Sequence, residues 1–130
     1  MSLAESFYEW TQAEPELTVL VAYRVYPARF PQEVSGGPEL VYTVISSNTE
    51  LGSPGFMQAR LQIDIFGKSF AAAERVAKVL RKHLHGYRGA AGSQIWQGVV
   101  LENEQSGFDD GPNRFRLSFD ARIWWSESHE

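Results

Sequence analysis

The chain has 130 residues, of which 43% are hydrophobic and 13% aromatic, so we expect a single globular domain over residues 1–130 rather than a disordered chain. It contains no cysteine, which excludes disulfides and thiolate metal sites, and no apolar run approaches the ~20 residues of a membrane span. The net charge is −4, with seven acids and two bases in residues 1–50 but six bases and one acid in residues 68–88. We expect a soluble, intracellular protein with no membrane partner.

In chain order, the first predicted elements are two helices. Apolar residues recur at helical spacing in residues 3–12, and Pro15 suits the first position of a second short helix over 15–22. Pro27 and Pro31 then favour an extended path and argue against further helix.

Four strands are predicted next, over residues 39–46, 57–65, 94–102 and 114–125. The second and the last alternate apolar and polar side chains, so the sheet has one apolar face that needs a covering layer. The predicted loops that join them in pairs, 47–56 and 103–113, are longer than tight hairpin turns, and such loops are either partner-binding arms or mobile tips.

A long helix over residues 69–85 supplies the covering layer. Ser69 suits its N-cap, Gly86 suits its C-terminal stop, and Phe70 begins an apolar stripe that continues through Leu80 and Leu84. The predicted fold class is α+β: a two-layer sandwich in which the long helix and the short N-terminal helices pack on one face of a mostly antiparallel four-stranded sheet. The predicted shared core comprises Phe70, Leu80, Leu84, Leu61, Ile63, Leu117, Phe119 and Ile123.

The predicted helix is also the basic part of the chain. Its cations cannot all be buried, because an unpaired buried charge is too costly, so they face water, an acidic neighbour or nucleic acid. Since residues 1–50 are acidic, we expect part of the basic strip to face that half of a neighbouring subunit, with passing DNA as the second alternative.

No pattern in the sequence indicates catalysis. There is no nucleophile elbow and no phosphate-binding loop. His83 and His85 stand two residues apart on a helix, which points their side chains about 200° apart and prevents them from sharing a metal. Asp109 and Asp110 lie in "FDDGPN", where turn chemistry is the simpler interpretation. We therefore predict no enzyme activity, no cofactor and no metal site.

Two aromatic residues, Phe66 and Trp124, fall on the polar face of their strands, where an aromatic side chain indicates a subunit contact or an ordinary surface position. The predicted contacts with other subunits or partners are Lys68, Arg75, Lys78, Arg81, Lys82, Arg88, Phe66, Trp124, Glu50, Leu51, Phe108, Asp109 and Asp110.

The succession of segments resembles a known family. "RVYPARFPQ", "PELVYTVISSNTE", "QARLQIDIFGKSFAAAERVAKVLRKHL" and "FRLSFDARIWW" follow one another as in the tail-completion, or tail terminator, proteins of long-tailed phages and prophages. The resemblance covers about residues 17–125 and includes no catalytic motif. The connection "EQSGFDDGPN" is where this chain departs from the pattern.

The resemblance implies a structural subunit without activity or cofactor. Such a protein forms a ring, usually a hexamer, on the head-proximal end of the tail tube, where it meets the tail-tube protein and the head–tail connector while DNA only passes through. Its expected location is the host cytoplasm during assembly and the virion tail afterwards. The alternative is a small ligand-binding or nucleic-acid-binding α+β module that uses the basic helix 69–85; the inner positions are too apolar to favour a ligand pocket.

Overall fold

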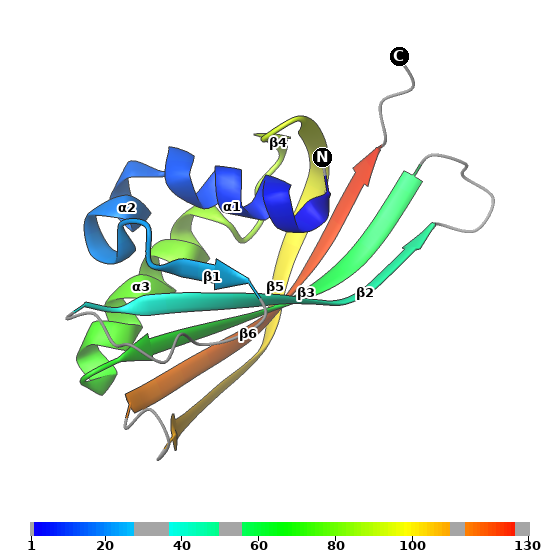
Figure 1. Ribbon diagram of the computed structural model, residues 1–130. Coiled ribbons are helices and arrows are strands. Elements are labelled where there is room, and N and C mark those ends of the chain that lie inside the picture. The colour runs from blue at the N-terminus through cyan, green and yellow to red at the C-terminus, as the bar shows by residue number, and fades with distance from the viewer. Residues whose placement is uncertain (1, 28–36, 50–55, 110–113, 127–130) are drawn as a thin grey trace.

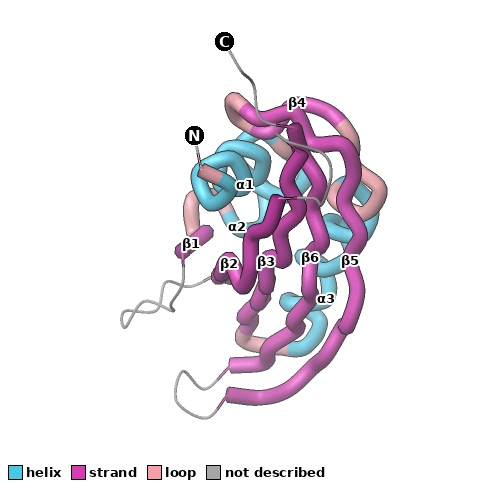
Figure 2. Tube along the Cα trace, turned by 90° about the vertical axis from the view of Figure 1, so that its right-hand side faces the viewer, coloured by secondary structure: helices cyan, strands magenta, loops and turns pink. Residues whose placement is uncertain are grey.

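The computed structural model describes residues 2–27, 37–49, 56–109 and 114–126, in which a six-stranded sheet curls into a half-barrel around three helices (Figure 1). Strands β2, β3, β6 and β5 run side by side along the molecule (Figure 2). In chain order the elements are α1 (Leu3–Ala13), α2 (Pro15–Val21), β1 (Val25–Pro27), β2 (Glu39–Thr49), β3 (Phe56–Gly67), α3 (Phe70–His83), β4 (Gly89–Ala91), β5 (Gln94–Asp109) and β6 (Arg114–Ser126).

The predicted fold class is wrong. The strand order is β1-β2-β3-β6-β5-β4, and the sheet is mixed because β1 pairs with β2 in parallel whereas all other pairs are antiparallel. The prediction lacked the edge strands β1 and β4, which have three residues each and so show no alternation, and which contain Pro27 and Gly89, residue types that disfavour strands. The molecule is a curled, mainly β structure rather than a four-stranded sheet under one long helix.

The helices begin where the sequence places their caps. Ser2 and Glu5 form a capping box at the start of α1, and Pro15 occupies the first turn of α2. Ser69 accepts a hydrogen bond from the Ala72 amide at 3.1 Å and so caps α3. Gly86 follows α3 with a φ of 81°, a conformation that glycine adopts without strain.

Helix α1 lies across the opening of the curled sheet, where it contacts β1 and β2 near one edge and β4 at the other. A row of aromatic rings follows the same path. Phe7 lies 5.1 Å from Tyr42 and 6.2 Å from Trp10, Trp10 lies 5.9 Å from Tyr87, and Tyr87 lies 6.1 Å from Trp96, all between ring centroids. The Phe7–Trp10 pair is stacked and the other pairs are tilted or edge-to-face. Such contacts add to the stability gained from burial, so α1 joins the two edges of the sheet.

The core prediction is confirmed except at one residue. Phe70 is 47% exposed because it is the first residue of α3, where side chains tilt toward the helix N-terminus and away from the sheet. The confirmed core residues are Leu61, Ile63, Leu80, Leu84, Leu117, Phe119 and Ile123.

The four long strands extend further than predicted, so residues 47–49 and 56 of the first expected loop and residues 103–109 of the second belong to the sheet. Strand β2 continues to Thr49 and β5 to Asp109. One β-bulge interrupts the pairing between Val44 and Ser46, and another interrupts it between Glu102 and Gln105. Because β3 and β6 are antiparallel along their whole lengths, the β2–β3 and β5–β6 hairpins point to opposite ends of the sheet (Figure 1).

Candidate assembly surfaces

The predicted basic contacts lie on α3 and on the segments next to it. The buried stripe of α3 packs against the sheet, which turns the cations of the helix away from it. Lys68, Arg75, Lys78 and Arg88 are exposed, and no ion pair joins them to any residue that the structure describes. These four cations are available to a partner.

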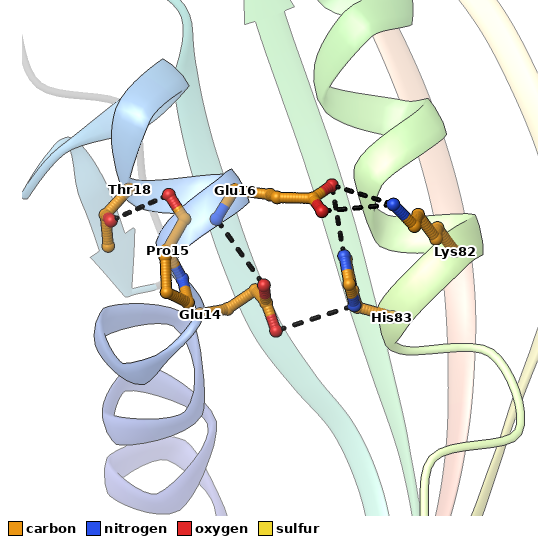
Figure 3. A network of polar contacts seen from close by, with 6 residues as sticks. All are labelled: Glu14, Pro15, Glu16, Thr18, Lys82 and His83. Carbon is orange, nitrogen blue, oxygen red and sulfur yellow. Dashed lines mark hydrogen bonds and ion pairs between the residues drawn. The ribbon is translucent and has the colours of Figure 1, made fainter.

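The end of α3 meets the acidic start of α2 within the same subunit (Figure 3). The Lys82 ammonium donates to both Glu16 oxygens at 3.0 and 3.3 Å. The His83 imidazole lies 3.1 Å from Glu16 and 3.6 Å from Glu14, although the first contact lacks hydrogen-bond geometry. Lys82 and, after it, His83 lower the pKa of the Glu16 carboxyl. Glu16 and Lys82 are therefore already paired without a neighbouring subunit.

Arg81 ties α3 to β5. Its guanidinium donates to Glu74 at 2.8 Å, contacts Glu104, and lies 5.5 Å from the centroid of the Phe119 ring. The hydrogen bond with Glu74, and to a lesser extent that with Glu104, raises the pKa of Arg81 against the opposing effect of burial. Two residues after the end of α3, the His85 Nδ1 accepts a hydrogen bond from a β5 backbone amide at 3.0 Å. Arg81 thus acts within the subunit, unlike the four exposed cations.

The two outer-face aromatic residues have different environments. Phe66 is only 6% exposed, so the prediction that it lies on an open polar surface is wrong. In register it lies between Glu39 and Arg116, and both Glu39 and the nearby Arg114 are buried, which shows that this end of the outer face is covered as well. Trp124 is half-buried on the outer face of β6, opposite Gly98.

The predicted hairpin contacts are only partly described. Phe108 is 47% exposed near the end of β5 and packs edge-on against Phe115, with ring centroids 5.1 Å apart. Asp109 is the last residue of β5. Glu50, Leu51 and Asp110 lie outside the described residues.

A polar network on the outer face was not among the predicted sites. Arg60 and Asn103 both donate to Asp120, at 3.1 and 3.0 Å. Next to them, Ser118 donates to Asp64 at 2.5 Å. The alternation of β3 and β6 already placed most of these side chains on one face, but it could not show which of them pair across strands. No helix packs on this part of the described sheet face, and its charged side chains are largely paired within the subunit.

The described residues offer little for chemistry. They contain no group of three or more metal-ligating side chains. One shallow hollow lies on the outer face around Arg60 and Asp120, and another lies between α3 and β5, with Leu101 and Phe119 in its lining. Both are open to solvent. Across the described residues, every helix is too short or too polar to span a bilayer.

Comparison with solved structures finds chains of similar fold, among them one from a virus-like particle. A chain of "Virion of native gene transfer agent (GTA) particle" superposes with a TM-score of 0.71 at 17% sequence identity, and the alignment covers 97% of this chain and 96% of that chain. At this identity the likeness shows a shared fold along nearly the whole length. No protein-family model and no curated protein matches the chain.

Proposed function

We propose that this protein is a structural subunit of a phage-like particle, and that it caps the head-proximal end of the tail tube as a ring and joins the tail to the head. The observation that carries the proposal is the nearly full-length fold likeness to a chain of a gene transfer agent virion. The resemblance of residues 17–125 to tail-completion proteins supports the finer role, because it depends on the sequence alone and not on the fold.

The shape of the subunit suits a position between two partners. Its two long hairpins point to opposite ends of the sheet, so one subunit can contact the tail-tube protein at one end and the head–tail connector at the other (Figure 1). We propose a ring, with a hexamer as the expected size, through which DNA passes. The protein would be located in the host cytoplasm during assembly and in the virion tail afterwards.

A non-enzymatic role agrees with the open hollows and the internally paired charges of the described residues. The alternative of nucleic-acid binding through α3 loses support because Arg81 and Lys82, two of the four Lys and Arg residues of the helix, are paired within the subunit. Binding of the isolated protein to duplex DNA at low and high salt separates these functions, since phosphate contacts weaken steeply with salt. We expect the isolated protein not to bind duplex DNA at the salt concentration of the cell.

Deletion of the gene in a particle-producing strain tests the proposal. We expect electron micrographs to show tails of uncontrolled length and heads without tails, and a plasmid-borne wild-type copy should restore joined particles. Mass spectrometry of purified particles should detect the chain, and labelling should place it at one end of the tail. Normal joined particles in the deletion strain, or purified particles that lack the chain, would contradict the proposal.

A further inference from the structure

The two outermost long strands are paired over only part of their outward sides. Strand β1 pairs with β2 over residues 40–42 alone, and β4 pairs with β5 over 94–96 alone. Further along β5, Val99 accepts from the Gly86 amide at 2.8 Å and the Leu101 amide donates to His85. Residues 43–49 of β2, here named the β2 edge, pair with β3 on their inward side, and residues 102–109 of β5, here named the β5 edge, pair with β6. On their outward sides, neither edge pairs with any strand that the structure describes.

Unpaired strand edges invite pairing with another chain, and proteins usually protect them with proline, lysine, bulges or short length. The short edges of this sheet fit that rule, since β1 ends at Pro27 and β4 has only three residues. The β2 and β5 edges are longer and contain neither proline nor lysine, although each contains a bulge. Charged side chains also protect an edge, and the β5 edge contains Glu102, Glu104 and Asp109. The β2 edge has no charged residue and only its bulge as protection, so it is open to a partner strand.

We infer that the β5 edge of one subunit pairs with the β2 edge of a second copy, so that the sheet continues from subunit to subunit around the ring. This inference rests on the ring of the proposed function and names its contact surfaces. Strands β2 and β5 run in opposite directions, because three successive antiparallel pairings separate them. A second copy that extends the sheet therefore adds its β2 antiparallel to β5 and continues the existing alternation. A head-to-tail contact of this kind generates a ring when the rotation between successive copies closes.

The positions of the two edges determine how neighbouring copies are staggered. Val44 is level with Leu61 of β3, whereas Ser106 and Phe108 are level, through β6, with Ile65 and Gly67. If Val44 of one copy lies opposite Ser106 or Phe108 of the next, equivalent sheet faces stay on the same side. Each copy is then shifted along the strand direction by four or six residues, about 13–20 Å at roughly 3.3 Å per residue. Across four strand spacings of about 4.8 Å, this shift inclines the strands by about 35–45°. Closed β-barrels have strand tilts of the same size, about 35–45°.

The side chains of the two edges are compatible. The β2 edge contains Val44 and Ile45, which are 40% and 49% exposed, and no charged residue. The acids at the start of the β5 edge are already paired, Glu102 with Arg122 at 2.8 Å and Glu104 with Arg81. The β5 edge can therefore pair with a neutral, partly apolar strand, and Glu102 and Glu104 keep their partners within the subunit. A pairing of two β5 edges would instead bring two basic α3 helices together.

The absence of cysteine allows a direct test by disulfide trapping. The double variants V44C/S106C and V44C/F108C correspond to staggers of four and six residues. If the edges meet in this way, mild oxidation of assembled rings should link successive subunits through one of the two pairs. Denaturing gels without reductant should then show a ladder that reaches the full ring, and reductant should collapse it to monomer. The control V44C/V19C places its second cysteine on α2, at a residue 82% exposed and away from the β5 edge, and should give no ladder.

The possible outcomes separate this inference from the proposed function. Rings that form, as judged by light scattering and electron microscopy, but yield no ladder from either pair overturn the edge pairing and leave the function standing. Failure of the wild-type chain to form rings, alone or with tail tubes, overturns both.

A second measurement uses the unmodified chain, so it does not depend on how the variants fold. Amide hydrogen exchange in residues 43–49 and 102–109 should slow at least tenfold when monomers assemble into rings, because edge amides become hydrogen-bonded. The α2 amides provide an internal reference and should change little. Unchanged exchange at both edges in assembled rings would contradict the inference.

Discussion

Replacing Leu80 by alanine tests whether α3 is held by packing into the curl of the sheet. Leu80 has no exposed surface and belongs to the core that α3 shares with β3 and β6. Removing three side-chain carbons at a fully buried leucine costs the lost transfer free energy plus a cavity term, about 2–5 kcal/mol in all. For a domain of this size, a loss of 3 kcal/mol lowers Tm by roughly 10 °C.

The matched control is Phe70→Ala in the same helix. Helical periodicity alone assigns both residues to the buried stripe, but Phe70 is 47% exposed, so its truncation should cost less than about 1 kcal/mol. Urea unfolding of dilute monomer, followed by tryptophan fluorescence and circular dichroism, gives both free energies of unfolding. The packing argument is refuted if the two substitutions cost the same, or if Leu80→Ala unfolds within 0.5 kcal/mol of wild type, an interval typical of surface changes.

Three further predictions concern the ends of the helices. Gly67→Ala should destabilise by about 1–3 kcal/mol in urea melts, because a Cβ would lie only 2.9 Å from a backbone nitrogen of α3, and a wild-type midpoint would contradict this. Ser69→Ala should cost about 1 kcal/mol and Ser69→Asp should restore most of it, whereas equal midpoints for the two variants would exclude a capping role. Because the pKa of Glu16 is lowered in the folded state, the ionised carboxylate stabilises the fold above about pH 4.5, and this stabilisation is lost as the pH falls through the folded-state pKa. The difference in unfolding free energy between wild type and Lys82→Met should therefore shrink as the pH falls through that window. A difference that stays constant with pH would contradict the pairing of Lys82 with Glu16.

Features that depend on local interactions could be predicted from the order of the residues. The capping residue Ser69, the stop at Gly86 and the apolar stripe between them define α3 to within two residues, because caps and helical periodicity act within a few turns. The alternation in β3 and β6 likewise identified their inner faces, since successive side chains of a strand must point to opposite sides.

How these elements pair, and how the sheet curls, depends on contacts between distant parts of the chain. Strands β1 and β4 exist because α1 and the curl of the sheet bring three-residue segments beside β2 and β5; segments as short as "VYP" and "GAA" show no alternation that would identify a strand. The burial of Phe66 depends on what covers one end of the outer face, which alternation cannot reveal. The pairing of Lys82 with Glu16 joins residues 66 positions apart. Charge counts gave the signs of these residues, but whether an acid meets a base within one subunit or between two depends on distances that only the folded chain sets.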